Sequence, residues 1–339
     1  MKIIRLILLS LLLFLVSCSS PVLDSRIPNQ SANGCHELVS GILNGSDSDI
    51  VDRFFLKNPV STGNVDYQIN FDRVEKWVKE FPFQHRNQVQ VSKLGRYDGE
   101  DVMRMDIPGW GGGDKKKLII TAGVHGNESA GVGTLINVVE RFLYNPNIRT
   151  QYDITIIPYL NPGGLKNNMR RLNNGVDFNR TLPGGRSTEQ KITRFLKTAL
   201  AGEKFDFGMD LHEAPFRDKF FVIKMFEDDD NLTRSVLDGI PKKYLTTSEN
   251  GEYPGFMYRA HVPGTEPYPR TSEYVSYELH APGEVSSFNK GTVKSFFYHQ
   301  LGAEHSYTFE SPGQMDLEEK IKIYTEIVER YLKNYLNLP

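Results

Sequence analysis

One histidine and one glutamate three residues apart, His125 and Glu128, could supply two ligands of a metal ion. They follow the continuous apolar run 118–122 and precede residues with helical periodicity. Imidazole nitrogen and carboxylate oxygen both bind Zn²⁺, and catalytic zinc sites combine three protein ligands with one open position for water. A histidine alone in a loop is more often structural. The pair therefore indicates a metal site only if a third ligand comes from elsewhere in the chain.

A third ligand is available directly after another strand-like segment. Apolar residues alternate over residues 205–211, and His212 follows at once. In open α/β sheets, ligands gather at the carboxyl ends of the strands. The chain between His125 and His212 is long enough for a helix and a strand, so His212 can return to the same edge. Asp210 is placed to orient one of these ligands from behind.

The elements around these residues predict an α/β fold. We expect strands at 89–94, 103–107, 118–122, 154–160, 205–211, 220–223 and 306–310, and helices at 71–81, 187–200 and from 317 to the C-terminus. Ser187 and Gln190 fit a capping box. Strands that alternate with helices predict a single domain with a mixed, mostly parallel twisted sheet and helices on both faces. The Pro- and Tyr-rich segment 248–277 is expected to be a long surface excursion.

Four further motifs follow in a fixed order. They are Asn161-Pro162-Gly163-Gly164, the pair Arg170-Arg171, Gly175-Val176-Asp177-Phe178-Asn179-Arg180, and Ser306-Tyr307-Thr308-Phe309-Glu310. With His125, Glu128 and His212, this set resembles the zinc carboxypeptidases (carboxypeptidase A-like metallopeptidases) from about residue 71 to the C-terminus. Residues 177–184, 210–212 and 310–314 are also similar to the succinylglutamate desuccinylase and aspartoacylase branch of that superfamily, whose members cleave N-acyl amino acids.

The resemblance implies a role for each matching residue. His125, Glu128 and His212 would bind Zn²⁺, and Glu310 would be the general base that takes a proton from water. Arg171 would stabilise the oxyanion, although the neighbouring Arg170 leaves this assignment open by one position.

Further residues would hold the substrate. Asn179 and Arg180 would bind its free carboxylate, because a guanidinium group matches a carboxylate with two hydrogen bonds. The substrate-closing tyrosine of the family would align with Tyr298 or His299.

The N-terminus has the features of a lipoprotein signal. Lys2 and Arg5 precede the apolar run 6–16, which is too short for the roughly 20 residues of a spanning helix. Residues 15–18 match the lipobox, so Cys18 is expected to be diacylated and to anchor the protein to a membrane. We therefore expect a signal peptide at 1–17, a tether at 18–34, an N-terminal extension at 35–63 and the catalytic domain at 64–339, in an extracytoplasmic bacterial lipoprotein.

Charge and cysteine content narrow the class of protein. The 40 Lys and Arg nearly balance the 42 Asp and Glu, so no footprint for nucleic acid is present. Of the 2 cysteines, only Cys35 would remain unmodified, which excludes an intramolecular disulfide.

The sequence thus predicts a lipid-anchored zinc metallocarboxypeptidase. It would hydrolyse an amide bond next to a free carboxylate, with cell-wall peptides as one candidate substrate. The alternatives are a deacylase of N-acyl amino acids and, with less support, a binding lipoprotein without catalysis.

Overall fold

The computed structural model describes residues 47–59, 65–85, 88–185, 187–224, 230–237, 239–245 and 291–336. The chain divides into two units, residues 1–46 and 47–339, and every described residue belongs to the second. The predicted signal peptide, Cys18, the tether and the segment 248–277 all lie outside the described residues. Among the described helices, none is long and apolar enough to cross a membrane.

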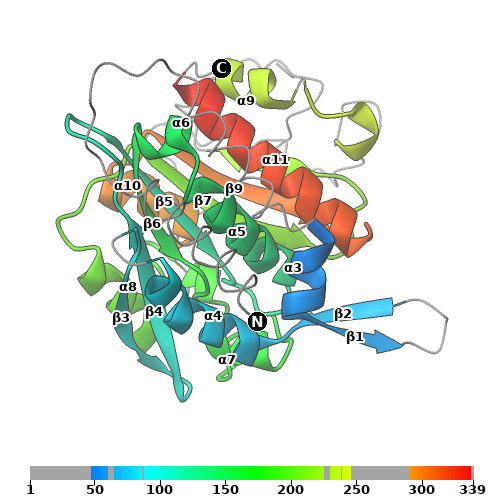
Figure 1. Ribbon diagram of the computed structural model, residues 1–339. Helices are drawn as coiled ribbons and strands as arrows, with labels where there is room; N and C mark the ends of the chain where they lie inside the picture. Colours follow the sequence, from blue (N-terminus) through cyan, green and yellow to red (C-terminus); the bar gives the residue numbers. More distant parts are fainter. Residues whose placement is uncertain are drawn as a thin grey trace, which may run out of the picture. The chain divides into compact units, whose positions relative to one another are not determined.

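A mixed seven-stranded sheet forms the centre of the second unit (Figure 1). Its order is β3 (Gln90–Tyr97), β4 (Glu100–Ile107), β6 (Tyr152–Ile157), β5 (Lys116–Ala122), β7 (Phe207–Ala214), β9 (His305–Pro312) and β8 (Phe221–Lys224). The four strands β6, β5, β7 and β9 are parallel, whereas β3, β4 and β8 pair antiparallel at the two edges. The predicted single α/β domain with a mixed sheet is confirmed.

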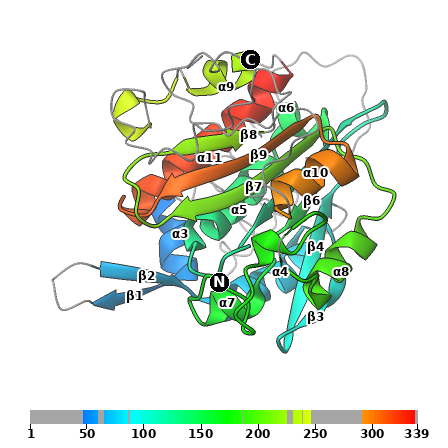
Figure 2. The same cartoon turned by 180° about the vertical axis from the view of Figure 1, so that it is seen from behind.

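Helices cover both faces of the sheet. α3 (Asp47–Phe54), α4 (Phe71–Gln84), α5 (Ser129–Phe142) and α11 (Leu317–Tyr335) contribute to the larger core, on the face seen in Figure 1. α8 (Lys191–Ala199) and α10 (Val293–Leu301) pack on the opposite face with a second core (Figure 2). Alternate residues of β5 serve the two cores: Ile120 belongs to the first and Ile119 to the second. This alternation follows from the two-residue period of a strand.

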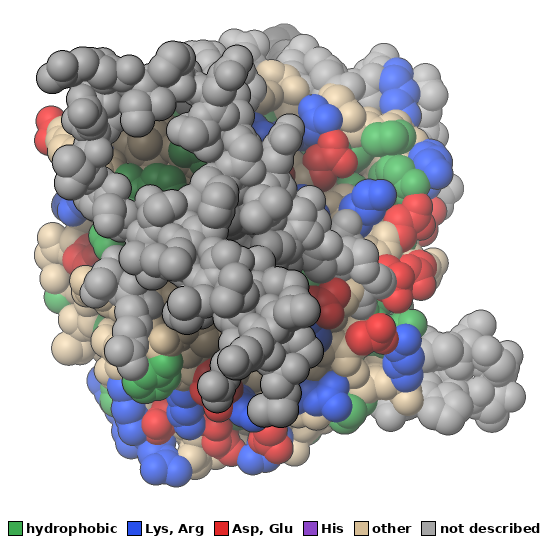
Figure 3. Space-filling model, in the orientation of Figure 1, with side chains coloured by type: hydrophobic (Ala, Val, Ile, Leu, Met, Phe, Trp, Pro, Cys, Tyr) green, Lys and Arg blue, Asp and Glu red, His purple; other side chains and the backbone are tan. Residues whose placement is uncertain are grey.

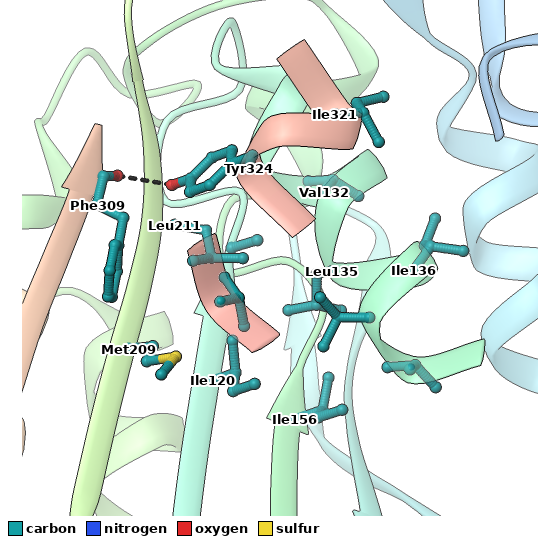
Figure 4. Close-up of a cluster of buried hydrophobic side chains, with 14 of the residues drawn as sticks. Ile120, Val132, Leu135, Ile136, Ile156, Met209, Leu211, Phe309, Ile321 and Tyr324 are labelled. Carbon is teal, nitrogen blue, oxygen red and sulfur yellow. Dashed lines mark hydrogen bonds between the residues drawn. The ribbon is translucent and has the colours of Figure 1, made fainter. Parts of the chain in front are cut away.

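The larger core brings α5 and α11 onto the strands that carry the predicted ligands. Figure 4 shows Leu135 and Ile136 of α5 near Ile120 and Ile156, with Tyr324 of α11 beside Phe309. All of these side chains are buried. Since apolar burial is the main favourable term in folding, this contact is what fixes α5 and α11 against the sheet.

Shorter elements complete the fold. They are the two-stranded sheet of β1 (Phe55–Pro59) and β2 (Val65–Ile69), the helices α6 (Pro146–Arg149), α7 (Pro162–Lys166) and α9 (Asp230–Leu237), and the 3₁₀ helices η1 (Phe178–Arg180) and η2 (Lys242–Tyr244). α3 and β1 precede residue 64, yet Phe54 and Phe55 are buried in the larger core.

On the face in Figure 3, Lys and Arg side chains lie among Asp and Glu side chains.

One predicted helix start is wrong. α8 begins at Lys191 with Gln190 as its N-cap. Ser187 therefore lies before the helix and cannot be the N-cap of the predicted capping box. The Gln190 amide instead accepts a hydrogen bond from Asn174 (2.7 Å) and donates one to the Thr188 carbonyl. The Ser187 N–H donates to the Arg180 carbonyl (3.0 Å), which holds this segment against the loop after η1.

Candidate metal centre

The predicted ligands meet at the carboxyl ends of the parallel strands. His125 and Glu128 lie in the loop between β5 and α5, and His212 lies near the end of β7. Glu310 lies in β9 directly beside His212 in the strand register. Parallel strands end at the same sheet edge, so residues from distant parts of the sequence lie together.

The metal-binding atoms of the three predicted ligands all lie within 4.8 Å of one another. Glu128 is central: its Oε1 lies 2.8 Å from His125 Nδ1, and its Oε2 lies 2.7 Å from His212 Nδ1. All three side chains are buried. The structure thus brings the three predicted ligands together, with both δ nitrogens and the carboxylate facing one point.

Each histidine is oriented by a carboxylate on its other nitrogen. His125 Nε2 lies 3.1 Å from Asp177 Oδ1, and His212 Nε2 lies 2.7 Å from Asp210 Oδ2. Thr121 donates a hydrogen bond to Asp210 Oδ1 (2.7 Å), which fixes that carboxylate in turn. A carboxylate behind a histidine is the usual support of a metal ligand, because it sets the tautomer and raises ligand basicity.

The contact of Asp210 with His212 agrees with its predicted place behind one of the predicted ligands. The contact of Asp177 with His125 was not predicted. The available signal was its place inside the motif 175–180, between the Gly-Val pair and the two residues predicted to bind the substrate.

The electrostatics of the site fit a cation. Burial opposes charge on Glu128, but His125 and His212 outweigh it and hold the pKa of this carboxyl well below its usual range. Burial likewise disfavours charge on His212, yet Asp210 and Glu128 raise the pKa of its imidazole well above the usual value. The group therefore favours positive charge among its carboxylates. Two nitrogens and one carboxylate suit Zn²⁺, so the residues present fit the predicted metal.

Glu310 has the properties of a proton acceptor. Burial raises the pKa of its carboxyl to about 7, and the positive charge of His212 lowers it only in part. A carboxyl with a pKa near the working pH can both accept and release a proton. Its position beside His212 and outside the ligand group separates the predicted base from the predicted ligands.

The structure distinguishes the two neighbouring arginines. Arg170 Nη1 donates to Glu128 Oε1 at 2.7 Å, and its Nη2 lies 3.5 Å from Asp177 Oδ2. Arg171 Nη1 donates to the carbonyl of Gly175 in its own loop (2.9 Å). The two side chains point in different directions from the loop, and the guanidinium group beside the predicted ligands is that of Arg170. The structure therefore places Arg170, and not Arg171, in contact with a predicted metal ligand.

Asn179 and Arg180 lie next to the site in η1. The Asp177 carboxylate accepts a hydrogen bond from the Asn179 N–H (3.0 Å), and the Asn179 side-chain oxygen accepts one from Val293 N at the start of α10 (2.8 Å). Arg180 donates to the Asn179 carbonyl (2.6 Å). Burial opposes charge on Asp177, but its contact with His125 and, to a smaller extent, the charges of Arg170 and Arg180 lower the pKa of its carboxyl. Both predicted carboxylate-binding residues therefore belong to the same cluster as His125.

Tyr298 and His299 are not brought to the site. They lie in the second half of α10, whose last residue, Leu301, accepts a hydrogen bond from Phe205 N (3.1 Å) just before β7 begins. α10 therefore lies at the amino end of β7 and β9 (Figure 2). His212 and Glu310 lie toward the carboxyl ends of these strands. The prediction that either residue closes over the substrate is corrected accordingly.

The turn at Asn161 supports the loop that carries His125. The Asn161 side chain accepts the N–H of Gly164 (2.8 Å) and begins α7. A Cβ atom on Gly126 would lie 1.9 Å from the carbonyl carbon of Gly164, so the two backbones touch. Only glycine at position 126 allows this approach.

Comparison with solved structures identifies the architecture. A protein from Shewanella amazonensis SB2B named as a metallopeptidase is similar with a TM-score of 0.60 at 17% identity, over 83% of this chain and 97% of that one. A metallo-carboxypeptidase from Burkholderia cenocepacia has a TM-score of 0.57 at 15% identity, over 84% and 78% of the two chains. The fold is that of the zinc carboxypeptidases.

The carboxypeptidase-like chain also carries features of a second branch. Residues 114–259 match the family model of the succinylglutamate desuccinylase/aspartoacylase catalytic domain. A metallo-carboxypeptidase from Pseudomonas aeruginosa, solved in complex with (2-guanidinoethylmercapto)succinic acid, has a TM-score of 0.52 at 15% identity, over 82% and 72% of the chains. No curated protein sequence matches the chain. Together these likenesses support a hydrolase of the metallo-carboxypeptidase or deacylase type.

Proposed function

We propose that this protein is a zinc-dependent carboxypeptidase that hydrolyses an amide bond next to a free carboxylate. The observation that carries the proposal is the convergence of His125 Nδ1, His212 Nδ1 and Glu128 at one buried point, with Glu310 beside them. Zinc bound there would lower the pKa of a water molecule toward about 7 and polarise the carbonyl of the substrate.

The residues of the chain would divide the remaining work. Glu310 would take the proton of the attacking water and pass it to the leaving amine. Its raised pKa suits this shuttle, since a weaker acid is a stronger acceptor. Arg170 lies at Glu128 and would stabilise the negative charge that develops on the carbonyl oxygen.

Arg180 and Asn179 would recognise the free carboxylate of the substrate. They lie beside Asp177, which contacts His125, so a carboxylate bound by them would be near the metal ligands. The Pseudomonas aeruginosa metallo-carboxypeptidase was solved in complex with (2-guanidinoethylmercapto)succinic acid, which carries carboxylate groups, and this is consistent with a substrate of this class.

The second candidate is a deacylase of N-acyl amino acids. The match of residues 114–259 to the desuccinylase/aspartoacylase catalytic domain favours it. Such a reaction would use the same ligands and the same base but would release an acyl group from one amino acid.

We also propose that the protein is a lipoprotein attached to an extracytoplasmic membrane surface through Cys18. Residues 15–18 and the polar tether that follows support this. An extracytoplasmic location would favour peptides, including those of the cell wall, as substrates. Cys18→Ser should move the protein from the membrane fraction to the soluble fraction of cells; membrane retention would contradict the anchor.

The decisive experiment compares three substrates on the same purified protein. Zinc content is measured first, and hydrolysis is then followed with C-terminally free peptides, the same peptides blocked as amides, and N-acyl amino acids. One equivalent of zinc and release of C-terminal residues from free but not amidated peptides would support the carboxypeptidase. Cleavage of acyl amino acids alone would favour the deacylase, and zinc without hydrolysis would favour the binding lipoprotein. Equal cleavage of free and amidated peptides would refute the carboxylate-binding role of Arg180.

A further inference from the structure

Two buried polar side chains of α11 reach the strands that carry the predicted metal ligand and base. Lys320 and Tyr324 are four residues apart and therefore lie on one face of the helix. Both residues are buried, and neither is among the predicted site residues. Their partners lie at the carboxyl ends of β7 and β9.

Lys320 acts on the site through Glu213. Its ammonium group donates to Glu213 Oε1 (2.5 Å) and to the Gly313 carbonyl (3.4 Å). The side chains of Lys320 and Glu213 are only 4% and 11% exposed, so the pair is held in a low-dielectric environment. Glu213 directly follows His212, and its backbone N–H donates to Glu128 Oε2 (3.2 Å).

Glu213 also holds the start of α5. Glu128 is the N-cap residue of α5, but its side chain faces the two histidines and makes no capping bond. The backbone N–H of Ala130, which has no partner within the helix, instead donates to Glu213 Oε2 (3.2 Å). A carboxylate at this place satisfies an unpaired N–H of the first helical turn and favours the helix dipole. Glu213 thus joins Glu128, α5 and, through Lys320, α11.

Tyr324 acts on the backbone of both strands. Its hydroxyl group contacts the Phe309 carbonyl (2.7 Å), as Figure 4 shows, and the His212 carbonyl (3.1 Å). Phe309 directly precedes Glu310. The Tyr324 hydroxyl therefore links the backbone of His212, the third predicted ligand, to the backbone of Phe309, the residue before the predicted base.

We propose that Lys320 and Tyr324 are positioning residues that set the geometry of the metal centre, Lys320 through Glu213 and Tyr324 through the carbonyls of His212 and Phe309. The proposal rests on the zinc-dependent function proposed above. A catalytic constellation has to be held within about 0.5 Å of its productive geometry by supporting contacts. Here that support comes from the last helix of the chain.

Tyr324→Phe tests the hydroxyl with minimal change of shape. The matched control is Tyr331→Phe, which alters a buried tyrosine of the same helix whose ring packs on Phe309 with centroids 4.9 Å apart. Full-length proteins are compared for zinc dissociation by chelator competition, for the visible spectrum of the Co²⁺-loaded form, and for kcat and KM. We expect Tyr324→Phe to speed zinc release by about 10- to 100-fold, to shift the Co²⁺ spectrum, and to lower kcat more than it raises KM.

The ion pair requires a paired substitution. Lys320→Met alone would leave the Glu213 carboxylate buried without its cation, which destabilises a fold strongly, whereas neutral replacement of both partners is often tolerated. The double variant Glu213→Gln/Lys320→Met should therefore stay folded but release zinc faster, and Lys320→Arg in the native background should release zinc at close to the native rate. Lys322→Met, on the exposed face of α11, is the matched control and should behave as the native protein.

The outcomes separate this inference from the proposed function. If the native protein binds zinc and hydrolyses its substrate while Tyr324→Phe and the double variant match their controls in zinc release, spectrum and kcat, the positioning role is wrong and the proposed function stands. If the native protein neither binds zinc nor hydrolyses any tested substrate, both proposals are wrong.

Discussion

The orientation of two imidazole rings decides what this site can bind. Asp177 and Asp210 contact the ε nitrogens of His125 and His212, so both δ nitrogens face Glu128. The same two carboxylates place negative charge behind the rings and strengthen their basicity. Because one particular nitrogen of each ring faces Glu128, the two δ nitrogens and the carboxylate surround one point where a metal ion would bind.

At the scale of the residue, Glu310→Gln should separate binding from turnover. The amide cannot accept the proton of the attacking water, so kcat should fall by about 10²- to 10⁴-fold. Zinc content should stay at the native level, because Glu310 is not one of the three clustered ligands. The measurement is kcat together with metal analysis of the same preparation, and near-native turnover would remove Glu310 as the base.

The two adjacent arginines provide a second test at this scale. Arg170→Met should lower kcat by about 10²- to 10³-fold, the usual effect of losing one donor to the oxyanion. Arg171→Met is the matched control, because the Arg171 side chain donates a hydrogen bond to the Gly175 carbonyl in its own loop. Steady-state kinetics of both variants decide between them. A larger loss in Arg171→Met would restore the assignment made from the sequence.

At the scale of the element, α5 lies unusually close to β7. A Cβ atom on Gly131 of α5 would lie 2.5 Å from the carbonyl oxygen of Leu211, next to His212. Backbone cannot yield as a side chain can, so the small residue allows the helix to approach the ligand strand. This contact fixes the distance between Glu128, at the start of α5, and His212 in β7.

Gly131→Ala should therefore destabilise the protein by about 1–3 kcal/mol, as overpacking of a close contact does. Gly133→Ala is the matched control in the same helix, because its Cβ would meet only the side chains of Ile321 and Phe55, at 2.9 and 3.0 Å. Urea unfolding of the two variants measures the difference. Equal losses would show that the approach of α5 to β7 is not limiting.

At the scale of the whole molecule, the metal would join elements that are distant in the chain. The β5–α5 loop would supply two ligands and β7 the third. Zinc would therefore bind the folded state and stabilise it by mass action, by about 2.7 kcal/mol at 100 times Kd. Removal of zinc with a chelator should lower Tm. The control is the same protein in buffer with calcium and without the chelator.

The loss of Tm on zinc removal should grow as pH rises. In the metal-free protein the pKa of His212 is raised by Asp210 and Glu128, although burial opposes this. The stability from protonated His212 is therefore complete below its unfolded pKa of about 6.5 and is lost as pH rises through the higher folded value. Protons also compete with zinc at low pH. Calorimetry from pH 5.5 to 8 measures both forms; a difference in Tm independent of pH would contradict this.

Much of the fold and the ligand set could be predicted from the sequence because their signals are local. Apolar runs in the sequence predicted the buried strands. The His125–Glu128 pair comes shortly after the run 118–122, and His212 comes directly after the alternating run 205–211. Since parallel strands finish at one edge, strand ends alone were enough to predict that these residues meet.

Only the tertiary structure decided which arginine faces the ligands, that Tyr298 and His299 lie at the opposite edge, and that Lys320 and Tyr324 reach the site. Adjacent loop residues have no periodic pattern that predicts direction, and a helical stripe does not show which neighbour it will meet. Lys320 and Glu213 are 107 residues apart, and Tyr324 and His212 are 112 apart. Such contacts exist only once α11 has packed on the sheet, so no local pattern of residues can encode them.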